Sequence, residues 1–513
     1  MTSTMAIHQL LDTSARRFSD APALSWKEQT LSYAKLAQAS LCAAHLLRSS
    51  GVRRGDRVLV SAADGCVTAA VVYGASRLGA IFIVVHADVR GAQLRHVISD
   101  TDAAVLITDD KTTEQEALSS GMPCLRYDGR GFGHASGELA DENVLGTDPA
   151  CFIYTSGSTA LPKAVVSTHQ QVLFAAEAIQ SCLGYRADDI VYCPLPLSFS
   201  YGLHQLFLAV LSGAHLYLAC ADEVGLALAE SLRRTGATIL TGVPSVCDAL
   251  AMLLSRTSAR VPRLRLLTNA GAVLSPRTMA TLRSQLPGLH IQVMYGLTEC
   301  KRATIMPPDG DLERPGSCGL PLPGTEILII GETGDPLQAG QTGQIVVRGP
   351  HVMSGYWRQP ELTALRLPRR EGLFPELHTG DYGRFDKDGY LYFTGRRDDL
   401  YKDRGVRVSC TEVEAAAQQI DGVSTAVVVP PQGRRGAVLA VVSDLPAKEI
   451  LYRMREQIEV FKIPRQCVSL AEIPTNGNGK YDRRQLADLL VRAGLIPDPE
   501  GGSVSGQTNR ARS

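Results

Sequence analysis

Residues 151–164 read Cys-Phe-Ile-Tyr-Thr-Ser-Gly-Ser-Thr-Ala-Leu-Pro-Lys-Ala, an apolar run followed directly by a turn of small and hydroxylated residues. The run Cys151–Tyr154 has the length of a strand, and Lys163 follows the turn. Small residues let backbone N–H groups approach an anion, hydroxyls add donors, and a lysine adds positive charge. The stretch therefore predicts a strand that ends in a phosphate-binding loop, although an isolated turn of this composition is more often only a turn.

The sequence around this stretch, from residue 31 to about 300, alternates between strand-like and helix-like patterns. Strand-like runs occur at Val58–Val60, Ala104–Thr108, Ile190–Cys193, His215–Leu218, Thr238–Leu240 and Leu264–Leu267. Helix-like stretches occur at Tyr33–Leu47, Gln171–Leu183 and Leu226–Arg234. This alternation predicts largely parallel sheets covered by helices, in which ligands bind in loops at the carboxyl ends of strands.

The pattern changes twice in the second half of the chain. After about Pro315, short strand-like runs at Glu326–Ile330, Gln344–Val347 and Tyr390–Phe393 are separated by glycines, which predicts a β-rich subdomain over about 315–397. From about Asp399, helix-like and strand-like stretches predict an α+β module; they are Thr411–Ile420, Thr425–Val429, Val438–Val442 and Lys448–Val460.

The expected fold class is therefore α/β, with a large N-terminal domain over residues 1–397 that has mostly parallel, helix-covered sheets and contains the β-rich subdomain. A small, mobile α+β C-terminal domain is expected over 398–495. The Gly/Ser-rich tail, 496–513, is expected to be disordered.

The composition favours a globular protein without a nucleic-acid or membrane partner. Of 513 residues, 45% are hydrophobic and 20% charged, and 52 basic residues balance 52 acidic ones. The 12 cysteines show no CxxC spacing, which argues against zinc sites. With no export signal at the N-terminus and no stretch typical of a membrane span, we expect a cytoplasmic protein with reduced thiols.

Other short motifs follow in order along the chain. Tyr295-Gly-Leu-Thr-Glu299 comes after the apolar run Ile291–Met294. The remaining motifs are Asn269–Ala272, His378–Asp381, Gly395–Asp399, and Asn478-Gly-Lys480-Tyr-Asp-Arg483. Each could be an ordinary turn or a solvated loop when taken alone.

Together, in this order and spacing, these motifs resemble those of the adenylate-forming superfamily, which includes acyl- and aryl-CoA ligases, nonribosomal peptide adenylation domains and firefly-type luciferases. The resemblance extends from the first helix to about Leu490. It implies that ATP is bound by Thr155, Ser156, Gly157, Ser158, Thr159, Asn269, Ala270, Gly271, Tyr295, Asp381 and Arg396.

The resemblance also implies a role for individual residues. The ring of Tyr295 would pack on adenine, and Asp381 and Arg396 would bind the ribose hydroxyls. Thr298 would contact the α-phosphate, Glu299 would help to hold Mg²⁺, and Lys163 would steady the pyrophosphate. Lys480 would enter the active site during adenylation, and Asp398 would be the hinge of the small domain.

The reaction implied is that of an ATP- and Mg²⁺-dependent ligase. It activates a carboxylic acid as an acyl-adenylate, releases pyrophosphate and passes the acyl group to a phosphopantetheine thiol, of CoA or of a carrier protein supplied in trans. Delivery to an amine remains an alternative. Ala160 and Ala164 stand where the family usually has glycine, so a degenerate, non-enzymatic scaffold that binds nucleotide or an acyl ligand also remains open.

The resemblance places the acid pocket at Pro194–Gly202, with Phe199 as an aromatic gate and Val243 in a wall. Ser200 stands where amino-acid-activating domains usually carry an aspartate for the substrate ammonium. Since a buried ammonium without a counter-charge is costly, Ser200 favours an uncharged acyl or aryl acid. A carboxylate elsewhere in the pocket would restore the alternative, an amino-acid-activating carrier-protein ligase.

Overall fold

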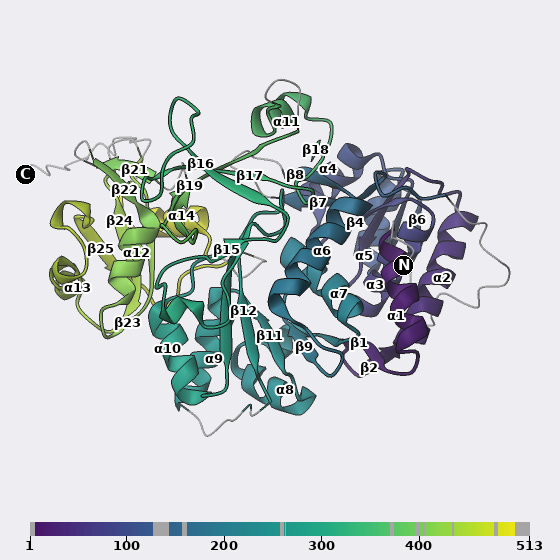
Figure 1. Cartoon of the computed structure of the whole chain (residues 1–513), viewed down its shortest axis with the longest axis horizontal. Helices are drawn as coiled ribbons and strands as arrows, with labels where there is room; N and C mark the ends of the chain where they lie inside the picture. Colours follow the sequence, from purple (N-terminus) through teal and green to yellow (C-terminus); the bar gives the residue numbers. More distant parts are fainter. Residues whose placement is uncertain are drawn as a thin grey trace, which may run out of the picture. The chain divides into compact units, whose positions relative to one another are not determined.

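The structure, a computed structural model, describes residues 6–126, 143–155, 162–256, 261, 263–369, 374–396, 400–403, 406–432, 435–476 and 481–497 (Figure 1). The chain divides into two compact units. The first comprises Met1–Leu274 and Thr278–Phe393, and the second comprises Ser275–Arg277 and Thr394–Ser513. Asp398 lies outside the described residues, so its assignment as boundary and hinge stays a prediction.

One sheet of the first unit has the strand order β15-β14-β13-β12-β11-β9-β10-β1-β2. The pairs from β1 through β10, β9, β11 and β12 to β13 are parallel, and β2, β14 and β15 add antiparallel edges. Its strands are β1 (Pro22–Trp26), β2 (Gln29–Ser32), β9 (Ile190–Cys193), β10 (His215–Leu218), β11 (Ile239–Gly242), β12 (Leu266–Asn269), β13 (His290–Tyr295), β14 (Thr304–Ile305) and β15 (Leu320–Pro321).

A second sheet has the order β18-β8-β7-β4-β3-β5-β6. The strands from β7 to β6 pair in parallel, whereas β7–β8 and β8–β18 are antiparallel. Its strands are β3 (Arg57–Ser61), β4 (Ile81–Val84), β5 (Val105–Thr108), β6 (Cys124–Arg126), β7 (Pro149–Thr155), β8 (Lys163–Thr168) and β18 (Gly355–Tyr356). The predicted helix-covered, mostly parallel sheets are confirmed.

Helices α3 and α7 lie between these two sheets. They are buried along almost their whole length, and they share one hydrophobic core with strands of both sheets. Helices α6 and α7 run side by side (Figure 1). The helices of this unit are α1 (Ile7–Arg17), α2 (Tyr33–Ser49), α3 (Gly65–Arg77), α4 (Gly91–Thr101), α5 (Lys111–Ser119), α6 (His169–Leu183), α7 (Ser200–Ser212), α8 (Leu228–Thr235), α9 (Pro244–Arg256), α10 (Pro276–Gln285) and α11 (Pro360–Arg366).

The predicted β-rich segment forms a sheet with the order β16-β17-β19-β20. Its strands are β16 (Glu326–Ile330), β17 (Gly343–Arg348), β19 (Leu377–Phe385) and β20 (Leu391–Arg396). Burial alternates along β19, so Leu377, Thr379 and Asp381 point inward together. This alternation is what buries Asp381.

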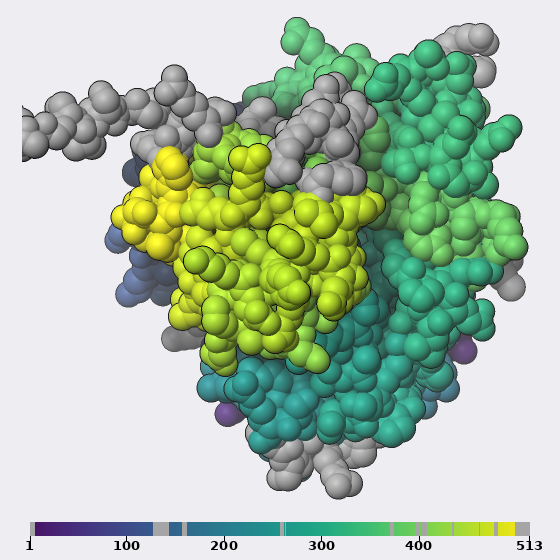
Figure 2. All heavy atoms as spheres, turned by 90° about the vertical axis from the view of Figure 1, so that its left-hand side faces the viewer, coloured from purple at the N-terminus to yellow at the C-terminus, as the bar shows by residue number. Residues whose placement is uncertain are grey.

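The second unit is a small α+β module, seen as one continuous yellow-green mass in Figure 2. Its apolar side chains form two clusters, on the two faces of the β23-β24-β25 sheet. Its elements are β21 (Leu400–Asp403), β22 (Val406–Ser409), α12 (Cys410–Gln418), β23 (Val423–Val429), β24 (Val438–Ser443), α13 (Ala447–Arg453), β25 (Gln466–Ser469) and α14 (Arg483–Arg492).

One predicted helix is shorter than its sequence pattern suggests. The pattern predicts Lys448–Val460, but α13 ends at Arg453 and continues as a 3-10 turn, Met454–Glu456. Met454, in this turn, and Ile458, after it, both pack in the core shared with α12. Among the described residues, no helix has both the length and the apolar character needed to cross a membrane.

Candidate functional site

The carboxyl ends of three parallel strands meet at one edge of the larger sheet. Gly242 of β11 lies opposite Asn269 of β12, and Asn269 lies opposite Val293 of β13. The residues that follow these strands therefore emerge at the same edge. They include the predicted site residues Val243, Ala270, Gly271, Thr298 and Glu299.

Tyr295, the last residue of β13, is joined to Asp381 of β19. The Tyr295 hydroxyl donates a hydrogen bond of 2.7 Å to Asp381 Oδ2, and both residues are buried. The Tyr295 ring also lies 5.6 Å from the ring of Phe393. Burial, together with the nearby carboxylate, holds the pKa of Tyr295 well above its usual value, so its hydroxyl stays a donor. The structure thus brings together two predicted residues that are 86 positions apart.

Tyr356 links two other predicted residues. Its hydroxyl donates to Glu299 Oε1 at 2.7 Å, and the ammonium of Lys163 lies 4.2 Å from the centre of its ring. Lys163 begins β8, whose partner β18 carries Tyr356. A cation over an aromatic face is attracted by the ring quadrupole. One buried tyrosine, which the sequence analysis did not identify, therefore contacts Lys163 through its ring face and Glu299 through its hydroxyl.

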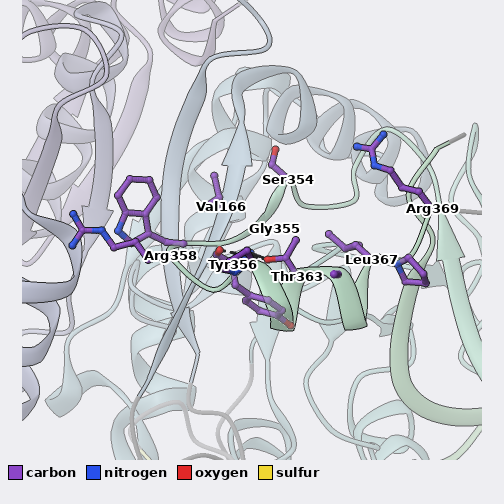
Figure 3. Close-up of a pocket in the computed structure, with 12 residues that line it drawn as sticks. Val166, Ser354, Gly355, Tyr356, Arg358, Thr363, Leu367 and Arg369 are labelled. Carbon is purple, nitrogen blue, oxygen red and sulfur yellow. Dashed lines mark hydrogen bonds between the residues drawn. The ribbon is translucent and has the colours of Figure 1, made fainter. Parts of the chain in front are cut away.

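Tyr356 also lines a pocket of about 540 Å³ between β8, β18 and α11, with Thr363 and Leu367 (Figure 3). The Tyr356 backbone N–H donates to Thr363 Oγ1 at 2.9 Å, across the pocket wall. None of the predicted site residues lines it. This pocket is therefore distinct from the predicted acid site.

The predicted phosphate loop joins two antiparallel strands, with Thr155 paired to Lys163. Ser156, Gly157, Ser158, Thr159 and Ala160 lie outside the described residues. The Oγ1 atom of Thr155 is buried and has no hydrogen-bond partner within the described residues. Ala164 is buried in β8 and packs in the core of the second sheet, so its methyl group has a packing role there.

The predicted acid segment is held against β12. Gly202 in the first turn of α7 approaches the preceding loop so closely that an added Cβ would lie 2.3 Å from the Pro196 carbonyl oxygen. The next contact is made by Tyr201, whose hydroxyl lies 2.7 Å from Thr268 Oγ1 and donates to the Thr268 carbonyl oxygen at 2.9 Å. Phe199 precedes α7, and Ser200 begins it. The predicted acid segment therefore contacts Thr268, the neighbour in sequence of the predicted nucleotide-binding residue Asn269.

Three predicted residues are not brought into this arrangement by the described structure. Lys480 and Asp398 lie outside the described residues. Arg396 is the exposed last residue of β20 and belongs to the second unit. Their roles stay predictions, as do the roles of the residues that do converge.

The turn after Glu299 contains two buried cations that the sequence analysis did not single out. Lys301 is 1% exposed and has a φ of +61°, a left-handed conformation that is costly for a residue with a side chain. Its ammonium donates to the His351 carbonyl oxygen at 2.8 Å, and burial lowers its pKa to about 8. Arg302 is 5% exposed. The two basic residues follow Tyr-Gly-Leu-Thr-Glu-Cys in the sequence, where nothing in the local pattern marks them as buried.

Comparisons with known proteins agree with these motifs. The sequence profile of the family described as AMP-binding enzyme matches residues 11–357. Feruloyl-CoA synthase from Amycolatopsis sp. is 30% identical over 476 residues, which cover 91% of this chain and 95% of the relative. The 3-hydroxybenzoate–CoA ligase of Aromatoleum sp. (strain CIB) is 28% identical, covering 94% and 96% of the two chains.

Two solved structures extend the comparison. VinN is 40% identical with a TM-score of 0.69, over 76% of this chain and 100% of VinN. The anthranilate CoA ligase AuaEII, solved with anthranoyl-AMP, has a TM-score of 0.86 over 96% of this chain and 99% of its own; at 22% identity it supports the fold alone. This chain therefore belongs to the AMP-binding enzyme family, as its motifs predict, and it is an adenylate-forming ligase that uses ATP.

Proposed function

We propose that the protein activates a carboxylic acid as its acyl-adenylate and then transfers the acyl group to a phosphopantetheine thiol, of CoA or of a separate carrier protein. One observation carries the proposal. Residues spread from Lys163 to Asp381 form two adjoining contacts, Tyr295–Asp381 and Lys163–Tyr356–Glu299, around the turn that follows β13. The names of the curated relatives, a feruloyl-CoA synthase and a 3-hydroxybenzoate–CoA ligase, support a thiol acceptor.

Adenylation needs positive charge and donors where negative charge gathers. A carboxylate oxygen attacks the α-phosphate of ATP, the bond to pyrophosphate breaks, and negative charge increases around phosphorus. Thr298 and Lys480 donate to the α-phosphate, and Lys163 steadies the departing pyrophosphate. The acid is already ionised at neutral pH, so no general base is needed.

Glu299 is the described residue that suits Mg²⁺. Magnesium is usually held by one or two carboxylates together with substrate phosphates, and among the described residues no group of three or more His, Cys, Asp or Glu side chains gathers to form a cage without ATP. When bound, Mg²⁺ would neutralise phosphate charge. Tyr356, by donating to Oε1, fixes the direction of the Glu299 carboxylate.

The second half-reaction requires the thiol to reach the same acyl carbon. The thiolate attacks the acyl-adenylate, the new C–S bond forms, and AMP leaves. We propose Asp398 as the pivot about which the small domain turns between the two steps. Asp398→Pro should then preserve pyrophosphate exchange and block transfer to the thiol; equal loss of both half-reactions would contradict the hinge.

Two classes of acid have support. Ser200 and the two aryl-named relatives favour an acyl or aryl acid. The likeness to VinN, which has been solved with L-aspartate, favours an amino acid with a second carboxylate. VinN is 40% identical to this chain, more than the two aryl-named relatives. Transfer to an amine is a further alternative for the acceptor, and the cytoplasmic location stays a prediction.

The deciding experiment is ATP–pyrophosphate exchange with a panel of aryl, fatty, dicarboxylic and amino acids, with hydroxylamine trapping to report turnover. We expect acid-dependent exchange that Lys480→Ala abolishes. Addition of CoA, or of a phosphopantetheinylated carrier protein, to the acid that gives exchange then identifies the acceptor. If the folded protein binds ATP but shows no exchange with any acid, it is a scaffold and the proposal fails.

A further inference from the structure

Arg302 is a buried cation without a carboxylate partner among the described residues. It is 5% exposed, and its Nε atom is buried with no hydrogen-bond partner in that part of the chain. One of its terminal nitrogens donates to the Lys301 carbonyl oxygen at 2.6 Å, and its guanidinium carbon lies 4.3 Å from the centre of the Tyr201 ring. These contacts position the group but do not neutralise its charge.

Other partly buried arginines of the same chain are paired with acids. Arg77 pairs with Asp12, Arg265 with Asp189, Arg283 with Asp309 and Asp311, and Arg348 with Glu376. Removing a guanidinium from water without a counter-charge is costly, and the protein avoids that cost at these four positions. Arg302 and Arg435 differ from these four, since neither has a carboxylate partner among the described residues, and Arg435 donates only to the Pro430 carbonyl and Gln432 side-chain oxygens. Of the two, Arg302 is the one that lies beside the predicted acid segment, so a counter-charge from a substrate would matter there.

The surroundings of Arg302 belong to the predicted acid site. It lies against Tyr201 in the first turn of α7, next to Ser200. Ser200 Oγ and His204 Nε2 are buried and have no hydrogen-bond partner within the described residues. Ser200 and His204 are four positions apart and so share one face of the helix. We call Ser200, Tyr201, His204 and Arg302 the acid-side cluster.

His204 does not add a second positive charge to this cluster. Its Nδ1 lies 2.7 Å from the Ser200 carbonyl oxygen and must donate to it, which leaves Nε2 as an acceptor in the neutral ring. Burial, aided by the nearby Arg302, lowers the pKa of His204 to about 3, so the ring is neutral at pH 7. The net charge of the acid-side cluster is therefore that of Arg302.

The turn that carries Arg302 is fixed relative to the predicted adenylation residues. An added Cβ at Gly296 would lie 2.7 Å from Arg302 Cα, so the two ends of the 296–302 turn are in contact. Tyr201, beneath the guanidinium, is bonded to Thr268 at the end of β12. Arg302 is thus held beside the carboxyl edge of the sheet, where we place the reacting carboxylate.

We propose that Arg302 binds a second carboxylate of the acid substrate, so that the enzyme activates one end of a dicarboxylic acid and holds the other. The inference rests on the proposed function and specifies its substrate class. It replaces the expectation, drawn from Ser200 alone, of an acid whose remainder is uncharged. Ser200 lacks a charge for an ammonium, but Arg302 supplies one for an anion.

The test compares each dicarboxylic acid with its own monoamide, which has nearly the same shape but lacks the second charge. Suitable pairs are succinate and succinamate, glutarate and glutaramate, and isophthalate and 3-carbamoylbenzoate; L-aspartate, whose two carboxylates differ, is compared with both L-asparagine and L-isoasparagine. ATP–pyrophosphate exchange gives kcat/KM for each. For the best pair, we expect wild-type enzyme to prefer the dicarboxylate by about 10- to 150-fold, the value of a charge-assisted hydrogen bond.

Arg302→Met should remove this preference while leaving the KM for ATP unchanged, and Arg302→Lys should restore part of it. Arg186→Met is the matched control. It makes the same substitution at an arginine whose side chain is 60% exposed, so it removes a charge from the surface and should leave the preference unchanged. Thermal melting and ATP binding report whether each variant folds. If Arg302→Met does not fold, the wild-type preference and the Arg302→Lys variant still decide.

The remaining outcomes separate the two proposals. If wild-type enzyme exchanges as well or better with the monoamides, or if Arg302→Met lowers exchange equally for both members of a pair, the second-carboxylate site is wrong and the ligase stands. If wild-type enzyme exchanges with no acid at all, the proposed function fails and this inference fails with it.

Discussion

Two buried polar clusters adjoin the turn at residues 296–302, and they differ in how far the protein satisfies them. The nucleotide-side cluster is formed by Lys163, Tyr295, Glu299, Tyr356 and Asp381. Its members bind one another within the chain, through two tyrosine–carboxylate hydrogen bonds of 2.7 Å and a cation over an aromatic ring. The acid-side cluster, in contrast, contains buried Oγ, Nε2 and Nε atoms with no partner in the described residues.

The difference indicates which part of each site the ligand must complete. Buried polar atoms are nearly always hydrogen-bonded, so a group of them left without partners calls for an explanation. For the nucleotide-side cluster the protein supplies the partners itself, which holds the geometry in place before ATP arrives. For the acid-side cluster we expect the substrate to supply them. Four predictions test this contrast, from the largest expected effect to the smallest.

The largest effect is expected at Glu299. Glu299→Gln should lower the rate of ATP–pyrophosphate exchange by about 100-fold or more, because the Mg²⁺ that we propose this carboxylate helps to hold would contribute several kcal/mol to transition-state stabilisation. Tyr356→Phe removes only the donor to Glu299 and should cost less than about 10-fold. Exchange kinetics at saturating Mg²⁺ measure both. Equal losses in the two variants would show that Tyr356 does more than orient the carboxylate.

A pH effect on stability is expected from His204. Its folded-state pKa is lowered to about 3 from 6.5, so the unfolded state binds more protons between these values and stability falls as the pH decreases below 6.5. His204 alone should contribute about 2–3 kcal/mol to the loss between pH 6.5 and 4.5.

Urea unfolding at several pH values measures this loss. His204→Gln should reduce the slope by the contribution of this one ring, since its amide cannot be protonated in this range; His169, His215 and His351, whose pKa values burial also lowers, keep the remaining dependence. His86→Gln, at a partly exposed histidine, serves as the control and should leave the slope unchanged. A variant at His204 with the wild-type slope would mean that the ring is already protonated or solvated in the folded protein.

A smaller loss of stability is expected at Gly296, which adjoins both clusters. Gly296→Ala places a Cβ 2.7 Å from Arg302 Cα and 2.9 Å from the Lys301 carbonyl oxygen, both backbone atoms that cannot easily move. Overpacking of this kind should destabilise the protein by about 2 kcal/mol. Gly288→Ala is the matched control, since its added Cβ meets nothing within 4 Å. Equal melting temperatures for the two variants would refute the close approach.

The smallest effect is expected from Tyr295→Phe, which removes one hydrogen bond of the nucleotide-side cluster. The free energy of unfolding should fall by about 1 kcal/mol, the net value of a typical buried hydrogen bond. Denaturant unfolding measures it against Tyr452→Phe, at a tyrosine that is 63% exposed. A loss no larger than the control's would mean that water or another donor replaces the hydroxyl at Asp381.

Much of the fold could be predicted from the sequence because its strands are short apolar runs with clear ends. The runs Ile190–Cys193, His215–Leu218 and Glu326–Ile330 have the same bounds as β9, β10 and β16. The run Leu264–Leu267 was placed two residues early, because Leu264 is as apolar as the strand itself but packs before β12 begins. Local pattern locates an element more reliably than its first residue.

The candidate site was less predictable because its contacts join distant segments. Motif spacing identified Tyr295, Glu299 and Asp381, but not the tyrosine at 356 that lies 57 residues from the carboxylate it contacts. Arg302 reads as an ordinary surface residue until its burial is known. Burial depends on packing across the whole unit, which periodicity along one segment does not report.

The short connection between β13 and β14 contains the predicted adenylation residues Thr298 and Glu299 and also Arg302, which we propose binds the second carboxylate. Since the connection is closed by the contact of Gly296 with Arg302, a substitution that reshapes it for a new acid also shifts Thr298 and Glu299. On the proposed acid site, changes of acid selectivity therefore have more freedom in α7, at positions other than the closely held Tyr201 and Gly202, where a side chain can change without moving the predicted adenylation residues. Among related ligases with different acid substrates, we expect residues of α7 to vary more than residues of the connection.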